Sequence, residues 1–351
     1  MEKLQSTLDR IRPTDKAKEE EAQRYSDGLT KPIGSLGVLE DIARKMAGIT
    51  GEIKPPLPKK TSILMAGDHG VVAEGVSAYP QEVTPQMVLN FLNGGAAMNV
   101  LARHAGAELI VVDIGVAADL PEHPILLNRK VAYGTANMAI GPAMTREQAV
   151  AALEVGIEVA ESYIAAGTGL FGTGEMGIGN TTPSAAITAF YKGCSAAEVC
   201  GRGTGLNDEG LQRKIKAIEQ AIAVNKPDPD DALDVLAKLG GYEIAGMAGV
   251  MLAAAANRVP VLIDGFISTV SAVIASRLHP HAAEYMLASH LSEEPGHLAA
   301  LSLLNLTPFL RMNMRLGEGT GAALAMTMVD AALKIMHEMA SFADAGISGA
   351  L

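Results

Sequence analysis

Short apolar runs that end in glycine or aspartate alternate with helical stretches through most of the chain, and this alternation constrains the fold more than any other feature. The clearest run is Glu108–Gly115, whose β-branched residues and lack of internal Gly or Pro predict a buried strand. Thr61–Asp68, Thr168–Gly174 and Val259–Asp264 have the same design. Continuously apolar strands separated by helices form parallel sheets covered on both faces. The pattern predicts an α/β fold: a parallel sheet flanked by helices, with ligands beyond the carboxyl ends of the strands.

Helices are expected between these runs, where apolar residues recur at helical spacing. They are predicted over residues 85–104, 145–165, 183–191, 210–224, 230–239 and 243–257. The spacing of strands and helices shows no internal repeat and no low-complexity tract. One parallel sheet therefore accounts for the middle of the chain.

The two ends of the chain differ from its middle. The first 50 residues are polar and predict helices over 2–12, 14–25 and 36–47, with Thr14 as an N-cap. A proline-rich linker at 55–58 ends this section, and beyond about residue 310 the chain returns to helix, most clearly over 320–339. We expect a large α/β domain over 55–310 and a small helical domain built from both termini, residues 1–54 plus 311–351.

Charge and composition exclude several classes of protein. Lys and Arg number 28 against 39 Asp and Glu, a net charge of −11, so no basic face for nucleic acid is expected. Cys194 and Cys200 match no zinc or disulfide pattern. The N-terminus lacks an apolar signal segment, and the longest apolar stretch, Ile244–Ala256, is shorter than the roughly 20 residues that cross a bilayer. These features predict a cytoplasmic protein without a membrane span.

A first glycine-rich turn, Gly172–Thr182, follows a predicted strand and leads into a helix. Closely spaced glycines let backbone amides approach an anion, and Asn180, Thr181 and Thr182 add side-chain donors. Gly172, Gly174 and Gly177 also satisfy the GxGxxG pattern of dinucleotide sites. No strand ending in an acidic residue follows about 20 residues on, which makes a NAD site the weaker alternative.

Two further turns place charged groups among glycines. Gly201–Asp208 precedes a helix with Lys214, which is either a phosphate cradle or a flexible surface loop beside a solvated basic helix. In Leu316–Gly321, Glu318 lies between two glycines ahead of an apolar helix. It is either an ordinary solvated Glu or a desolvated carboxyl whose raised pKa suits a general base.

Other polar residues close two of the predicted strands. Asp68-His69-Gly70 and Asp264-Gly265 fall at the ligand-facing end of the sheet, although Asp-Gly is also an ordinary turn. The stretch 279–297 is rich in histidine but has no known metal-ligand spacing. We expect a loop with hydrogen-bonding histidines and no metal site.

Several of these segments, taken together and in this order, resemble the nicotinate-nucleotide–dimethylbenzimidazole phosphoribosyltransferase family. The matching segments are Lys31–Glu40, Ala66–Val72, Gly75–Ser77, Glu82–Thr84, Gly172–Thr182, Asp264–Phe266, Ser289–His290 and Gly317–Gly321. The resemblance implies a Rossmann-like sheet, a small helical domain and a homodimer in which each site lies near the partner's small domain. It implies transfer of 5-phosphoribose from nicotinate mononucleotide to 5,6-dimethylbenzimidazole, without a cofactor.

The resemblance also implies roles for individual residues. Glu318 matches the family's general base, and Glu175 is a second catalytic candidate. The phosphate and nucleotide would be bound by Gly174, Gly177, Gly179, Asn180, Thr181, Gly203, Lys214, Asp264 and Ser292, and the base by Ser77, Tyr79, Gln86 and Leu316. A NAD-dependent oxidoreductase and a non-catalytic nucleotide-binding regulator are the two alternatives.

Overall fold

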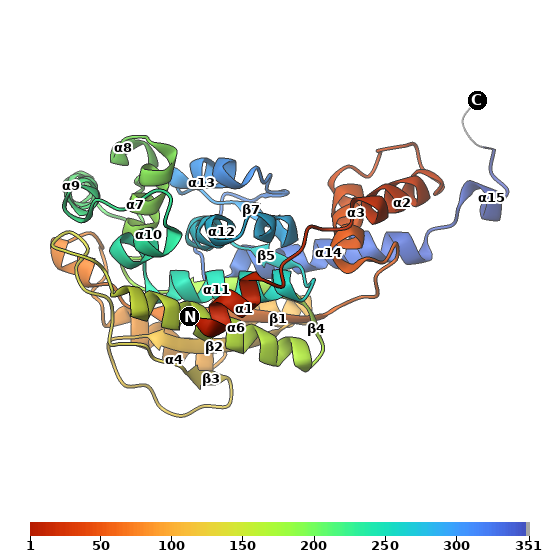
Figure 1. Cartoon of the computed structure of the whole chain (residues 1–351). Coiled ribbons are helices and arrows are strands. Elements are labelled where there is room, and N and C mark those ends of the chain that lie inside the picture. Colours follow the sequence, from red (N-terminus) through yellow and green to blue (C-terminus); the bar gives the residue numbers. More distant parts are fainter. Residues whose placement is uncertain (349–351) are drawn as a thin grey trace.

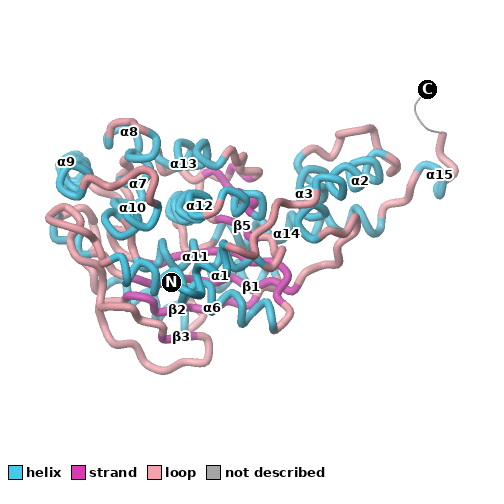
Figure 2. Tube along the Cα trace, viewed as in Figure 1, coloured by secondary structure: helices cyan, strands magenta, loops and turns pink. Residues whose placement is uncertain are grey.

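A six-stranded sheet forms the centre of the computed structural model, which describes residues 1–348 (Figures 1 and 2). Its strand order is β3-β2-β1-β4-β5-β6, and every neighbouring pair is parallel. The strands are β1 (Lys59–Gly67), β2 (Glu108–Gly115), β3 (Leu126–Asn128), β4 (Thr168–Met176), β5 (Val261–Ile263) and β6 (Met286–Ala288). A separate parallel pair joins β7 (His290–Leu291) to β8 (Leu310–Arg311). The predicted α/β fold with a parallel sheet is confirmed.

The order of the strands indicates where a ligand binds. β1 and β4 are neighbours at the centre of the sheet. β2 and then β3 lie on the outer side of β1, and β5 and then β6 lie on the outer side of β4. This is the order of Rossmann sheets, which bind ligands in the crevice beyond the two strands where the direction reverses. Here those strands are β1 and β4, which end at Gly67 and Met176.

Fifteen α-helices surround the sheet within the described residues. They are α1 (Glu2–Leu8), α2 (Lys16–Asp27), α3 (Val38–Thr50), α4 (Val83–Leu92), α5 (Ala97–Ala105), α6 (Arg146–Ala165), α7 (Thr181–Lys192), α8 (Ala196–Val199), α9 (Asp208–Asn225), α10 (Ala232–Leu239), α11 (Tyr242–Ala256), α12 (Phe266–Leu278), α13 (Gly296–Leu304), α14 (Thr320–Glu338) and α15 (Phe342–Ala345). Short 3₁₀ turns cover Gly70–Glu74 and Pro280–Tyr285.

Alternating side chains of the strands pack into two separate apolar layers. In β1, Ile63 and Met65 belong to the core shared with α6 and α11, while Leu64 and Ala66 face α4, α5 and the start of α14. Successive side chains of a strand point to opposite faces, so a continuous apolar run is required when both faces are covered. This explains why the strands were recognisable in the sequence.

A helical unit extends from one end of the sheet domain, on the right in Figure 1. α2 and α3 pack together there, and α14 runs from the sheet to lie beside α3. The first helix departs from the expected grouping of residues 1–54, because α1 packs on α6 and α11. Its terminal ammonium contacts Glu154 at 2.6 Å, and Arg10 pairs with Glu161 at 2.5 Å. These ion pairs are exposed, and the buried side chains of Leu4 and Ile11 attach this segment to the helices beneath it.

Three local expectations are wrong. The single helix expected over 85–104 is two helices, because Gly94 has a positive φ of 73° and ends the first one. The N-cap of α2 is Asp15, whose side chain accepts the backbone N–H of Lys18 at 3.0 Å. Residues 279–297 are not one loop, since they contain a 3₁₀ turn and strands β6 and β7 and reach the start of α13.

Among residues 1–348, no helix combines the length and the apolar character needed to cross a membrane.

Candidate active site

A cavity of about 470 Å³ lies at the carboxyl end of the sheet, where the three glycine-rich turns meet. The turn after β4, the turn before α9 and the turn before α14 each supply part of its wall. Loop residue Tyr79 and two side chains of α4, Val83 and Met87, form an apolar part of the lining. The cavity is large enough for a small organic ligand and lies where a Rossmann-type sheet places one.

Glu318 lies in the turn just before α14 and lines the cavity. Its backbone is left-handed, with a φ of 62°, between Gly317 and Gly319, whose φ values are 79° and 87°. A left-handed conformation at a residue other than glycine is strained and is retained where the surrounding structure requires it. Burial, and then the nearby Asp264 carboxylate, raises the pKa of Glu318 to about 7. The side chain is therefore desolvated, which decides between the two alternatives for this residue.

Glu175, at the end of β4, connects the first turn to the third. One oxygen of its carboxyl accepts a hydrogen bond from the Asn180 amide, and the other accepts the backbone N–H of Glu318 at 3.3 Å. Burial is the main cause that raises the pKa of Glu175 to about 8, with Asp264 and Glu243 adding to it. Two buried carboxyl groups with raised pKa values thus lie against one cavity.

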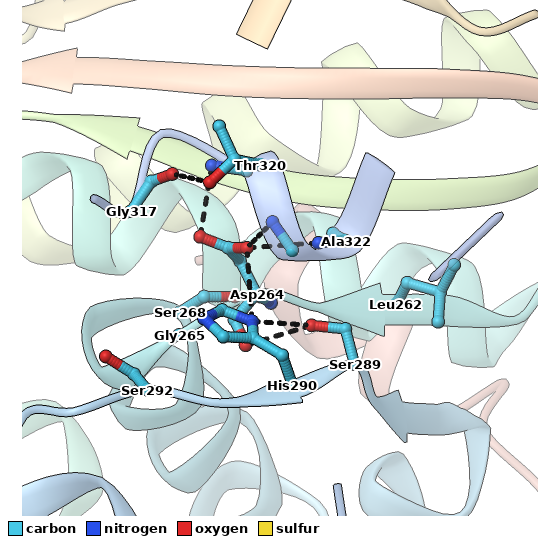
Figure 3. Close-up of polar contacts among 12 residues, drawn as sticks. Leu262, Asp264, Gly265, Ser268, Ser289, His290, Ser292, Gly317, Thr320 and Ala322 are labelled. Carbon is cyan, nitrogen blue, oxygen red and sulfur yellow. Dashed lines mark hydrogen bonds and ion pairs between the residues drawn. The ribbon is translucent and has the colours of Figure 1, made fainter. Parts of the chain in front are cut away.

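Asp264 follows β5 and anchors the beginning of α14 (Figure 3). Its Oδ1 accepts the backbone N–H groups of Gly321 and Ala322 at 2.7 and 3.0 Å, and its Oδ2 accepts that of Gly319 at 3.1 Å. A carboxylate at a helix N-terminus satisfies otherwise unpaired N–H groups and interacts favourably with the helix dipole. Asp264 lines the cavity, but its oxygens are already occupied with holding the Glu318 turn in place.

Lys214 lies beneath the cavity wall and does not line it. Its ammonium donates to Thr181 Oγ1 at 2.6 Å and to the carbonyl oxygen of Gly201 at 3.1 Å. The side chain is fully buried, and burial lowers its pKa. Thr181 and Gly203, which do line the cavity, separate the ammonium from the open space. The cation is thus held directly behind the turn that was expected to bind phosphate.

The structure brings most of the expected site residues to this cavity. Those that line it are Tyr79, Glu175, Gly177, Asn180, Thr181, Gly203, Asp264, Ser292, Leu316 and Glu318. Gly174, Gly179, Lys214, Ser77 and Gln86 do not. Ser77 lies nearby, with its hydroxyl 3.3 Å from Thr204 Oγ1, whereas Gln86 is exposed on α4.

Gly174 has a packing role that the sequence did not reveal. A Cβ at this position would lie 2.5 Å from the carbonyl oxygen of Glu318. Only glycine therefore lets the Glu318 turn approach β4 so closely. Gly172 likewise lies within β4 and leaves room for Met326 of α14. The GxGxxG match is not a dinucleotide fingerprint, because its first two glycines belong to the strand and not to a turn that opens a helix.

Other lining residues were not expected. The charged ones are Glu294 and Arg315, and Thr204, Met176 and Phe266 add further contacts. Arg315 directly precedes the third turn and Thr204 lies within the second, so the glycine-rich segments were a usable signal for both. Glu294 lies in the histidine-rich stretch, two residues beyond Ser292, which was the one residue of that stretch expected at the site.

Three of the four histidines of that stretch form hydrogen bonds, as expected, whereas the buried Nδ1 of His279 has no partner among the described residues. His297 contacts Thr269 Oγ1 at 2.9 Å and accepts the backbone N–H of Ser292 at 2.9 Å, and His281 contacts Glu284 at 2.7 Å. In the described part of the chain, no group of three or more His, Cys, Asp or Glu side chains is placed to hold a metal ion.

The fold and the site define a Rossmann-like α/β protein with two buried carboxyl groups of raised pKa against one cavity. Comparison with known proteins agrees: the model of a phosphoribosyltransferase family matches residues 11–347. The chain belongs to the nicotinate-nucleotide–dimethylbenzimidazole phosphoribosyltransferase family, and it is a phosphoribosyltransferase.

The relatives match along the whole chain. A protein of Geobacter sp. (strain M21) with this family name is 56% identical over 348 residues, covering 99% of this chain and 100% of the relative. One of Chloroflexus aurantiacus (strain ATCC 29366 / DSM 635 / J-10-fl) is 58% identical, covering 99% of both chains. The crystal structure of CobT from Thermus thermophilus superposes with a TM-score of 0.92 at 48% identity, covering 95% of this chain and 100% of that one.

Proposed function

We propose that this enzyme transfers the 5-phosphoribosyl group of nicotinate mononucleotide to 5,6-dimethylbenzimidazole, forming nicotinate and α-ribazole 5′-phosphate for the nucleotide loop of cobalamin. The relatives that match from end to end carry the names of this donor and this acceptor. The observation that carries the proposal is Glu318, a desolvated carboxyl of raised pKa that opens on the cavity from a strained turn.

The chemistry requires one base and no acid. Nicotinate is joined to the ribose through a cationic ring nitrogen, so it leaves as a neutral pyridine when its bond to C1′ breaks. One imidazole nitrogen of the acceptor forms the new bond to C1′, and the other must lose its proton. Glu318 takes this proton, which a carboxylate of pKa near 7 does efficiently at neutral pH. Attack on the face opposite the leaving group converts the β-nucleotide into the α-product.

Glu175 and Asp264 support the base from two sides. Glu175 accepts the N–H of Glu318, and Asp264 fixes the first turn of α14 through its backbone N–H groups. Both hold the base at a defined place relative to the acceptor. Positioning of this kind supplies much of the rate in a reaction that joins two bound substrates.

The donor's phosphate is assigned to the end of the cavity formed by Thr181 and Gly203. Thr181 begins α7. Thr182 and Ser184 donate their backbone N–H groups to carbonyl oxygens and Pro183 has none, so in this first turn only the N–H of Thr181 is left for a ligand. Lys214 directly behind Thr181 supplies positive charge in a protein that is otherwise acidic. Ser292 lines the nucleotide side of the same cavity.

The acceptor is assigned to the apolar part of the lining, between Tyr79 and Leu316. Val83, Met87 and Met176 complete a surface that suits a dimethyl-substituted aromatic ring. Two flexible methionines can adapt to rings of different size. A panel of benzimidazoles, phenols and purines is therefore the appropriate way to define the base that is preferred.

We also propose that the enzyme works as a homodimer in the cytoplasm, with the small helical domain of one subunit close to the active site of the other. The helical unit around α2 and α3 extends beyond the sheet domain (Figure 1). The exposed residues of this unit include Ile33 and Val38, and a second subunit would bury their side chains.

The test is incubation of the purified protein with nicotinate mononucleotide and 5,6-dimethylbenzimidazole, followed by chromatography for nicotinate and a new nucleotide. Both products are expected, and neither when the base is omitted. Tight binding of nicotinate mononucleotide without turnover would favour a regulator instead, and reduction of NAD by a candidate substrate would favour an oxidoreductase.

A further inference from the structure

His69 and Glu243 form a buried ion pair that the proposed reaction does not use. His69 Nε2 lies 2.7 Å from Glu243 Oε1, and the side chains are 1% and 0% exposed. His69 follows β1, and Glu243 belongs to the first turn of α11. Although burial opposes it, the Glu243 carboxylate raises the pKa of His69 above its ordinary value, and Asp68 adds to this. The imidazole is thus the buried hydrogen-bonding partner of the Glu243 carboxyl.

The glycine turn after β4 rests on this imidazole. A Cβ added to Gly177 would lie 3.4 Å from His69 Nε2 and 2.2 Å from the carbonyl oxygen of Gly67. A Cβ on Gly241 would lie 2.4 Å from His69 Cε1. Neither glycine has room for a side chain: at Gly241 the obstacles are the ring and the Glu243 carboxyl, and at Gly177 the obstacle is the carbonyl oxygen of Gly67, with the ring at ordinary contact distance.

The turn leads directly from the ion pair to the two cavity carboxyls. Beyond Gly177 it reaches Asn180, whose amide donates to Glu175. Glu175 in turn accepts the backbone N–H of Glu318 at 3.3 Å. A continuous path of contacts and hydrogen bonds thus runs from His69 to Glu318.

Glu243 depends on His69 for compensation of its charge. Its Oε1 contacts the imidazole, while its Oε2 has no hydrogen-bond partner among the described residues. A buried ion pair is lost as a unit when one partner is removed, because the other charge is left unpaired. The pair is therefore a buried support that is lost when either partner is removed, and the glycine turn packs against its imidazole.

We propose that the His69–Glu243 pair is a positioning element for phosphoribosyl transfer. The pair fixes the position of the glycine turn relative to the end of β1, and this position aligns the side chains of Glu175 and Glu318. The inference rests on the proposed function. His69 acts through the turn and not on the substrates, so its loss affects the chemical step more than substrate binding.

The test compares His69→Gln and Gly241→Ala with the wild type in the nicotinate-release assay. His69→Gln keeps a donor but removes the ring and its charge, whereas Gly241→Ala pushes the ring while leaving both charged groups in the chain. For both variants kcat is expected to fall by about 10- to 100-fold, since a misplacement of about 1 Å has effects of that size. The KM for nicotinate mononucleotide is expected to rise by a smaller factor than kcat falls, because Thr181 belongs to the displaced turn whereas Gly203 and Lys214 do not.

Asp113→Asn is the matched control. It breaks another buried pair, in which Asp113 of β2 lies 2.8 Å from the ammonium of Lys130, a residue just beyond β3. This variant is expected to lose thermal stability and to keep its kcat. The proposal is overturned if either His69→Gln or Gly241→Ala, shown by thermal unfolding to be folded, keeps a kcat within twofold of the wild type. It is also overturned if the kcat of Asp113→Asn falls by as much as theirs. If His69→Gln does not fold, Gly241→Ala decides the question alone. A wild type that releases no nicotinate refutes the proposed function instead.

Discussion

Glu318 combines an unusual backbone conformation with a buried carboxyl group. Its left-handed backbone and its two glycine neighbours turn the carboxyl towards the cavity, and burial holds its pKa at about 7. In the unfolded chain the same group would titrate near 4.5. The difference between these two values has a measurable consequence for stability.

We predict that Glu318→Gln gains thermal stability relative to the wild type as the pH rises. The pKa is higher in the folded protein than in the unfolded chain, so folding is favoured by protonation of this group. Its stabilising contribution is complete below about pH 4.5 and is lost as the pH rises through 7. Gln does not ionise and avoids that loss. Unfolding midpoints measured at pH 5 and pH 8 are the test, and a difference between the two proteins that stays constant would contradict a desolvated carboxyl.

Lys214 allows a prediction with an internal control. Lys214→Met is expected to weaken binding of nicotinate mononucleotide by about tenfold, because the ammonium lies behind Thr181 and attracts the phosphate through the cavity wall, an interaction of roughly 1–2 kcal/mol. Binding of the nucleoside without its phosphate should change little. Calorimetric titration of both ligands measures the contrast. Equal losses for the two would mean that the ammonium supports the Thr181 turn without contributing to phosphate binding.

At the scale of elements, the contact between β4 and the start of α14 determines where the base lies. We predict that Gly174→Ala lowers kcat by about 100-fold, because its Cβ would lie 2.5 Å from the Glu318 carbonyl oxygen and displace the turn. Gly141→Ala is the control, since a Cβ there meets nothing within 4 Å. Steady-state assays of both variants, with thermal unfolding alongside, give the answer. Full activity in Gly174→Ala would show that the turn tolerates displacement.

The sequence was most informative where local pattern and tertiary role coincide. The strand over Glu108–Gly115 was predicted to the residue because both of its faces are buried. Helix α12 was missed, since it is buried on all sides and lacks an amphipathic pattern, and β-branched residues such as Val270, Val273 and Ile274 are not typical of helices.

The site shows the same division between local and distant information. The three turns and Glu318 were found because glycines and carboxyl groups are adjacent in the chain. The burial of Lys214 behind Thr181 and the packing of Gly174 against Glu318 depend on contacts between distant segments. No local pattern encodes such contacts, and the grouping of α1 with the large domain escaped prediction for this reason.

At the scale of the whole molecule, the extended helical unit leads to a prediction about assembly. Sedimentation of the intact protein is expected to give the mass of two chains, because the unit around α2 and α3 exposes apolar residues that a two-fold contact would cover. Sedimentation and activity should be measured at the same protein concentration. A fully active species with the mass of one chain would refute both the dimer and the close approach of the partner's small domain to the site.

The central claim is that Glu318 removes the proton of the acceptor in a phosphoribosyl transfer. The most direct measurement is the rate of nicotinate release by Glu318→Gln beside the wild type at pH 7, together with the affinity of each for nicotinate mononucleotide. The substitution keeps the shape of the side chain and removes the base, so the rate is expected to fall by about 10²–10⁴-fold while affinity stays within a few-fold. A Glu318→Gln enzyme that releases nicotinate at nearly the wild-type rate would contradict the account.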